Sequence, residues 1–69
     1  MNETVIIFAA RYAHTRNTGA ALAVVSHILE VWDKLGRPAR EQIYKESFEA
    51  QYCSDDWRRL QDRFERKQD

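Results

Sequence analysis

The stretch TGAALAVVSHILEVWDKL, residues 18–35, decides the fold. Its apolar side chains follow a 4-3-4-3 spacing, which is typical of a helix in the seam of a bundle. The residues in this spacing are Ala21, Val25, Ile28, Trp32 and Leu35. Further apolar residues cover the other sides of the helix: Leu22, Val24, Leu29 and Val31. A helix that is apolar nearly all round is buried on more than one side, so we expect residues 18–35 to form the central helix of an all-α domain.

Capping signals mark both ends of this segment. Asn17 or Thr18 is predicted to be the N-cap, because a short polar side chain can accept a hydrogen bond from the first turn. Gly36 stands where a left-handed C-cap residue is expected, and Lys34 suits the negative end of the helix dipole.

The segment before the central helix, about residues 3–15, is also predicted to be helical. One face carries Val5, Phe8, Ala9 and Tyr12, and a second apolar strip beside it carries Ile6, Ala10 and Ala13. The β-branched run at residues 4–7 leaves a short strand as the alternative.

Two helices are predicted after the central one, at about residues 38–52 and 54–67. In the third helix Pro38 is allowed in the first turn, Glu41 and Lys45 are spaced as an outer ion pair, and the expected inward residues are Ala39, Ile43 and Phe48. In the fourth helix Ser54 is the expected N-cap, and Asp55 and Asp56 suit the positive end of the dipole. Its expected inward residues are Trp57, Leu60 and Phe64. The prediction is thus a single three- to four-helix domain over residues 1–69.

A chain of 69 residues is short for an independent domain. Such a domain buries only about 60% of its unfolded surface, so disulfides, metals or partner subunits commonly stabilise it. Cys53 is the only cysteine, which excludes an internal disulfide and fits a reducing compartment, and the two histidines and Cys53 are too widely spaced for a zinc site. We therefore expect a homo-oligomeric helical bundle. The expected subunit contacts are Val25, Ile28, Leu29 and Trp32.

The charges are balanced in number but not in distribution. Eleven basic residues match eleven acidic ones, which argues against a general nucleic-acid binder. Between Thr4 and Leu29 there is no acidic residue, and the only fixed charges are Arg11 and Arg16. The first apolar run is too short for a membrane span, and its flanks do not resemble a signal peptide. A cytoplasmic protein without membrane contact is therefore expected.

A polar, cationic cluster interrupts this apolar half at residues 10–22, ARYAHTRNTGAAL. A helix N-terminus with small side chains can bind an anion, and arginine can bind phosphate in a bidentate manner. The predicted ligand-binding residues are Arg11, Tyr12, Thr15, Arg16, Thr18 and Gly19. The alternative is structural: the two arginines pair with acids of later helices, such as Glu46 or Glu49.

Catalytic chemistry has little support in the sequence. A thiol nucleophile would need Cys53 beside His14 or His27, and nothing in the spacing favours this pairing. His27 is expected to be a packed histidine of an apolar helix. We therefore expect a protein that is not an enzyme and that needs no metal or other cofactor.

The run from Phe8 to Leu35 resembles short open reading frames of bacteriophages and prophages. The similarity rests on an Arg-Tyr-Ala-x-x-Arg-x-Thr core, here residues 11–18, followed by an apolar helix that ends near Trp32 and Leu35. The resemblance implies a phage accessory protein that acts in the host cytoplasm, where such proteins commonly antagonise host defence.

Three functions follow as expectations. In the first, an oligomer sequesters a phosphate-bearing nucleotide signal, such as a cyclic nucleotide or an ADP-ribose-type molecule, without turnover. In the second, the protein binds and blocks a host defence complex, as anti-CRISPR proteins do, through surface residues of the later helices. The candidates for that contact are Trp57, Arg58, Arg59 and Arg63. In the third, the chain is a structural or assembly module.

Overall fold

The chain folds into four α-helices of 12 residues each. The computed structural model describes residues 2–52 and 54–66. The helices are α1 (Glu3–His14), α2 (Gly19–Glu30), α3 (Arg37–Phe48) and α4 (Asp55–Arg66), and a 3₁₀ turn, η1 (Trp32–Lys34), follows α2. No strand occurs in the described residues, and residues 4–7 lie within α1. The all-α prediction is therefore confirmed, and the strand alternative is wrong.

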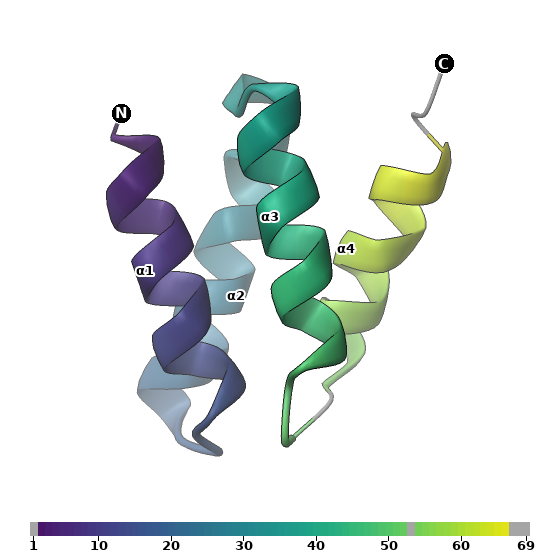
Figure 1. Cartoon of the computed structure of the whole chain (residues 1–69). Helices are drawn as coiled ribbons and strands as arrows, with labels where there is room; N and C mark the ends of the chain where they lie inside the picture. Colours follow the sequence, from purple (N-terminus) through teal and green to yellow (C-terminus); the bar gives the residue numbers. More distant parts are fainter. Residues whose placement is uncertain (1, 53, 67–69) are drawn as a thin grey trace.

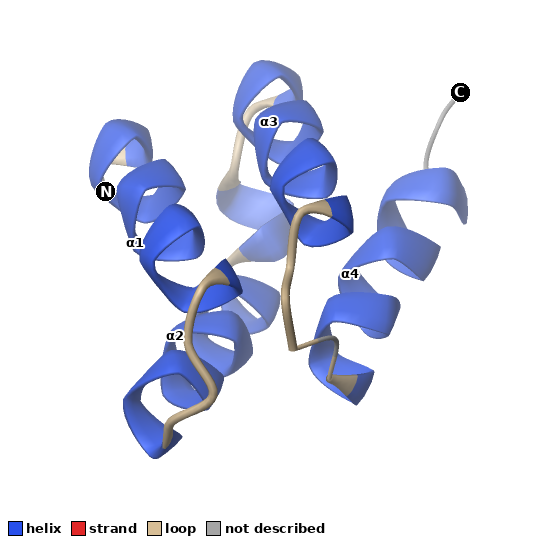
Figure 2. Cartoon of the chain, turned by 60° about the horizontal axis from the view of Figure 1, so that its bottom comes forward, coloured by secondary structure: helices blue, strands red, loops and turns tan. Residues whose placement is uncertain are grey.

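Successive helices run in opposite directions along one bundle (Figure 1). The helices α1 and α4 do not form a major contact with each other; each packs against both α2 and α3. The loop from α1 to α2 and the loop from α3 to α4 lie at one end, and the connection from α2 to α3 lies at the other end, as does the start of α1 (Figures 1 and 2). We call the first of these ends the loop end of the bundle.

The predicted seam of α2 is the centre of the core. Ala21, Val25, Ile28, Trp32 and Leu35 are all between 0% and 3% exposed. They pack against α1 and α4, the two neighbours of α2. This corrects the predicted subunit contacts: Val25, Ile28 and Trp32 are already buried inside their own chain, and only Leu29 is partly exposed. Other helices of the same chain therefore cover the seam of α2, whereas Leu22 on another side of this helix is 46% exposed.

The end of α2 also differs from the prediction. The α-helix stops at Glu30, and η1 continues the chain to Lys34, so Trp32 and Leu35 reach the core through a tighter turn. Gly36 is extended, with φ −72° and ψ 162°, and is the N-cap of α3 rather than a left-handed C-cap of α2. Its N–H donates to Glu3 Oε2 at 2.6 Å, which connects this turn to the beginning of α1.

In α1 and α3 the buried faces are not the ones that carry the largest apolar side chains. In α1 the second apolar strip is the buried one, with Ile6, Ala10 and Ala13 at 7%, 0% and 2% exposure. In α3 the expected inward residue Phe48 is 61% exposed, and Ser47 is buried in its place. The Ser47 hydroxyl can occupy the core because it donates to the carbonyl of Tyr44 and accepts from Gln61 Nε2.

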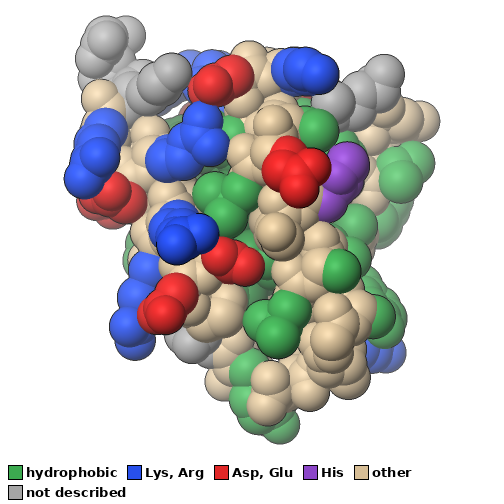
Figure 3. Space-filling view, turned by 180° about the vertical axis from the view of Figure 1, so that it is seen from behind, with side chains coloured by type: hydrophobic (Ala, Val, Ile, Leu, Met, Phe, Trp, Pro, Cys, Tyr) green, Lys and Arg blue, Asp and Glu red, His purple; other side chains and the backbone are tan. Residues whose placement is uncertain are grey.

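The fourth helix follows its predicted pattern. Trp57, Leu60 and Phe64 are 2%, 0% and 7% exposed, and Ser54 Oγ accepts the N–H of Trp57 at 3.4 Å, as an N-cap does. Its outer side carries arginines paired with acids one turn away. Charged side chains consequently gather over the α4 side of the surface (Figure 3).

Candidate functional site

The polar cluster of residues 10–22 lies at the loop end of the bundle. Two loops meet there, because the N–H of Gln51 in the α3–α4 loop donates to the carbonyl of His14 at 2.7 Å. This bond joins positions 37 residues apart in sequence, and it places the α3–α4 loop beside the end of α1 (Figure 2).

Arg11 has a structural partner on α3. Its Nε donates to Glu46 Oε1 at 3.1 Å, and the Glu46 side chain is only 12% exposed. Gln42 Nε2 lies 3.4 Å from the same oxygen, and His14 Nδ1 lies 3.6 Å from Oε2. For Arg11 the structural alternative is therefore confirmed, since this guanidinium neutralises a mostly buried carboxylate.

Arg16 has a different environment. Its Nη1 donates to Thr15 Oγ at 3.0 Å and lies 3.4 Å from the carbonyl oxygen of Tyr12. Its guanidinium carbon lies 4.2 Å from the centre of the Tyr12 ring, which is a cation–π distance. In the described part of the chain no carboxylate pairs with Arg16, and its Nε and Nη2 have no hydrogen-bond partner. Arg16 is thus held in place by Tyr12 and Thr15, and two of its guanidinium nitrogens can still donate hydrogen bonds to a ligand.

The predicted threonine ligands are committed to local hydrogen bonds. Thr15 Oγ donates to the Tyr12 carbonyl at 3.0 Å. Thr18 Oγ accepts the N–H of Ala21 at 3.1 Å, which confirms Thr18 as the N-cap of α2 and occupies one donor of that first turn. Gly19 faces open space. The six predicted residues therefore do not form one cradle, because Arg11 is directed to α3 and the two hydroxyls serve their own turns.

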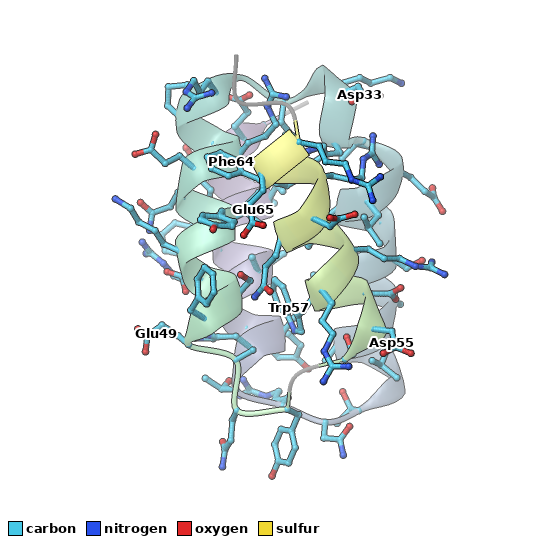
Figure 4. All side chains as sticks on the ribbon, turned by 90° about the vertical axis from the view of Figure 1, so that its right-hand side faces the viewer. Asp33, Glu49, Asp55, Trp57, Phe64 and Glu65 are labelled. Carbon is cyan, nitrogen blue, oxygen red and sulfur yellow. The ribbon has the colours of Figure 1, made fainter. Side chains whose placement is uncertain are left out.

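A pocket of about 340 Å³ lies beside Arg16 at the loop end. We call it the loop-end pocket. Its buried walls are Ala13, Ala21, Val25 and Trp57, and its more exposed lining residues are Arg16, Asn17, Leu22, Tyr52 and Ser54. Figure 4 shows Trp57 close to the beginning of α4, the part of that helix from which it reaches the pocket. Arg16 is the one predicted ligand residue that lines it.

Three lining residues come from the later part of the sequence, and none of them was among the predicted ligand-binding residues. Tyr52 and Ser54 belong to the α3–α4 loop, and the weak turn signal around residue 53 was the only sign that this loop existed. Trp57 was predicted correctly as a core residue. Local spacing could not show that this loop lines the same pocket as Arg16, because their proximity depends on the packing of α1 against α3.

The pocket has an apolar interior and a positive rim. Among the described residues, no Asp or Glu lines it. Both α2 and α4 begin at this end of the bundle with a partial positive charge, and α1 and α3 end there with a partial negative charge, so Arg16 is the main source of positive charge at the rim. The acids that begin α4 are paired elsewhere: Asp55 with Arg58 and Asp56 with Arg59. The arrangement favours a ligand that combines an anionic group with an apolar or aromatic body.

The expected protein-binding residues of α4 are only partly available at the surface. Trp57 is buried, and Arg63 donates to the carbonyl of Leu29 at 3.0 Å and to Asp33 Oδ1 at 3.1 Å, so it fastens α4 to α2 and η1. Arg58 and Arg59 remain exposed.

Other classes of site have no counterpart in the described residues. Residues 2–52 and 54–66 contain no group of three or more His, Cys, Asp or Glu side chains that could hold a metal ion. Cys53 lies outside the described residues, so the hypothetical pairing of its thiol with a histidine is not placed. Among the described helices none has both the length and the apolar character needed to cross a bilayer.

No protein-family model matches the chain, and searches of curated proteins and of solved structures found no match to it.

Proposed function

We propose that this protein is a binding protein for a small anionic ligand, which it holds in the loop-end pocket without chemical turnover. The observation that carries the proposal is Arg16: it is fixed by Tyr12 and Thr15, pairs with no carboxylate of the described residues, and lines a cavity with apolar walls. An arginine held in this way loses little freedom when it binds, which favours recognition of phosphate or carboxylate.

The size of the pocket restricts the ligand class. A volume of 340 Å³ is at the lower end of the range of about 300–1,000 Å³ for small-molecule sites. A mononucleotide or a cyclic mononucleotide suits this volume better than a dinucleotide. The phosphate would face Arg16 and Asn17, and the base would lie near Tyr52 against the apolar wall that includes Trp57. This narrows the phosphate-bearing signal expected from the sequence.

The phage resemblance provides a biological setting for such binding. A protein that removes a nucleotide signal from the host needs affinity and no nucleophile, and the pocket offers binding groups of that kind. Sequestration of a host signal is therefore the role that we propose, with blocking of a host defence complex as the alternative expected from the sequence.

Calorimetric titration of the whole chain tests the proposal. The probes are inorganic phosphate, nucleoside monophosphates, 3′,5′-cyclic mononucleotides and ADP-ribose. We expect saturable heat with at least one nucleotide, and we expect Arg16→Gln to weaken that binding by roughly tenfold to a hundredfold, since one charge-assisted contact contributes about 1.5–3 kcal/mol.

Arg37→Gln is the matched control. Arg37 is also an arginine stacked on an aromatic ring, 5.5 Å from the centre of Phe64, and it has no ion pair in the described part of the chain. It begins α3 at the opposite end of the bundle. Equal losses in the two variants would indicate unspecific charge attraction, and the absence of heat with every probe in a folded protein would overturn the proposal.

A further inference from the structure

A row of large apolar side chains is exposed along α1. Val5, Phe8 and Tyr12 are 60%, 60% and 42% exposed, and their spacing places them on one side of the helix. We call this row the α1 ridge. These residues point away from the buried strip of α1, so no helix of the described chain covers them.

An apolar groove lies next to the α1 ridge, between α1 and α2. It has a volume of about 280 Å³. The residues that line it are Ile6, Ala9, Ala23, Val24, His27 and Ile28. We call it the α1–α2 groove. Three alanines of this face, Ala9, Ala20 and Ala23, leave little side-chain bulk, so another helix could approach the backbone closely.

The ridge and the groove form a face without acidic residues. The chain has no Asp or Glu between Thr4 and Leu29. Of the two arginines in this part, Arg11 is paired with Glu46 on α3 and lies 5.6 Å from the centre of the Phe8 ring, and Arg16 lies over the Tyr12 ring at one end of the ridge. In the view from behind, red and blue side chains gather on the α4 side, whereas the lower right is mostly green and tan (Figure 3). Such a face matches an apolar, uncharged surface better than a charged partner.

We propose that the partner of this face is a second copy of the chain, related by a two-fold axis, with the α1 ridge of each copy in the α1–α2 groove of the other. A two-fold interface must be complementary to itself, and this face provides both a projecting row and an apolar hollow side by side. The proposal does not rest on the function proposed for the loop-end pocket.

The available area indicates a weak or moderate dimer. Phe8 and Tyr12 together expose roughly 200 Å² if fully exposed aromatic residues have about 150–250 Å² each. A stable complex usually buries about 800 Å² on each partner, and the two aromatic residues of the ridge supply about a quarter of that area, so a weak dimer is expected. We expect a dissociation constant in about the micromolar range.

Sedimentation equilibrium over a wide range of concentration is the first test. We expect a monomer–dimer equilibrium for the wild type. Phe8→Glu and Ala23→Lys should each weaken the dimer by about tenfold or more, because each introduces two unpaired charges into an apolar contact. Phe48→Glu is the matched control, since Phe48 is 61% exposed but lies on α3, and it should leave the equilibrium unchanged.

A mixture of two variants tests the arrangement itself. In a mixed dimer of Phe8→Glu with Ala23→Lys, one ridge–groove contact has opposite charges and the other has the wild-type residues. The mixture should therefore associate more tightly than either variant alone. Circular dichroism of each variant shows whether the helices are retained.

Each contrary result has a definite meaning. A folded wild type that stays monomeric at all concentrations overturns the proposal, and so does a dimer that Phe8→Glu leaves intact or that Phe48→Glu disrupts equally. Failure of the mixture to associate excludes the two-fold ridge-in-groove arrangement. Phe8 does not line the loop-end pocket, so Phe8→Glu should leave nucleotide binding unchanged, and this inference and the proposed function can fail separately.

Discussion

Arg11 and Arg16 show how strongly position on a helix determines what an arginine can do. Arg11 lies on the side of α1 that meets α3, where Glu46 takes its charge at 3.1 Å. Arg16 lies beyond the end of α1, stacks on Tyr12 and lines the loop-end pocket. In the sequence both residues belong to one cluster, and the structural alternative correctly predicted Glu46 as a partner. It could not show which arginine would take which role, because that depends on the packing of α3 against α1.

Arg11→Ala should lower stability while leaving ligand binding intact. Arg11 is about half exposed but Glu46 is mostly buried, so removal of the guanidinium should lower the free energy of unfolding by about 1–3 kcal/mol. Urea unfolding and calorimetric titration of the same variant measure the two quantities. If the variant lost nucleotide binding as strongly as Arg16→Gln does, Arg11 would belong to the ligand site after all.

Tyr44 gives the fold a dependence on alkaline pH. Its hydroxyl donates to Glu65 Oε2 at 2.9 Å, and this bond, partial burial and the negative charge of Glu65 raise the pKa of Tyr44 above its ordinary value of 10.0. Because the folded state holds this proton more tightly than the unfolded state, the contribution is complete below about pH 10 and is lost as the pH rises through the folded pKa.

Tyr44→Phe should therefore flatten the decline in stability on the alkaline side. The measurement is the free energy of unfolding in urea at a series of pH values from about 9 to 12, across the range in which tyrosine titrates. Tyr52→Phe, which changes an exposed phenol of the α3–α4 loop, serves as the control and should keep the wild-type slope. An identical slope in Tyr44→Phe and the wild type would show that the bond to Glu65 is not maintained in solution.

At the scale of elements, α2 and α4 were predictable because their patterns were strong. The seam of α2 and the three inward residues of α4 are all buried as expected. The faces of α1 and α3 were harder to predict. In α1 two apolar strips compete and the one with smaller side chains is buried, since alanine lets α1 approach its neighbours closely. In α3 the buried position is filled by Ser47, whose hydroxyl is satisfied by contacts that hydrophobicity does not reveal.

Gly36 distinguishes the predicted turn from the observed one. A left-handed C-cap would make Gly36→Ala costly, by about 1 kcal/mol. The observed φ of −72° suits alanine, and a Cβ there would meet Glu3 Oε2 at 3.4 Å, an ordinary contact. We expect Gly36→Ala to change the free energy of unfolding by less than about 1 kcal/mol, because the lower entropy of the unfolded chain favours alanine whereas the N-cap position favours glycine. Thermal unfolding monitored by circular dichroism measures the change, and a clear loss would support the left-handed turn.

Variants of Thr18 can show whether this residue serves only as the N-cap of α2 or also binds the ligand. Thr18→Ala should cost about 1 kcal/mol, because the N–H of Ala21 loses its acceptor. Thr18→Ser keeps the hydroxyl and should restore most of the stability. Both variants should bind the nucleotide as the wild type does, which titration can verify. Weaker nucleotide binding by a fully folded Thr18→Ala variant would show that Thr18 belongs to the ligand site.

At the scale of the whole molecule, the described residues form one core, and no disulfide is available within a chain that has a single cysteine. The self-association expected from the length stays a prediction, and its expected place does not fit the structure: the α2 seam is covered within the chain, whereas the large apolar side chains that are exposed on α1 are Val5, Phe8 and Tyr12. The loop-end pocket joins residues from both halves of the sequence. Local spacing could therefore identify Arg16 as a candidate but could not identify Tyr52.

Association through the α1 ridge should appear in thermal unfolding. Binding between folded copies stabilises the folded state by mass action, so the Tm of the wild type should rise with protein concentration. The Tm of Phe8→Glu should be independent of concentration, and Phe48→Glu should behave as the wild type. Differential scanning calorimetry at several concentrations makes the comparison. A wild-type Tm that does not vary with concentration would count against a second copy on this face.

The beginning of α1 and the loop-end pocket lie at opposite ends of the bundle. A protein anchored to a sensor chip or a bead through a linker ahead of Asn2 would therefore present the pocket to the flowing solution, with the length of α1 as a spacer. Attachment through a side chain of the α3–α4 loop would instead place the pocket against the support. The direction of tethering thus decides whether an immobilised sample can report on its ligand.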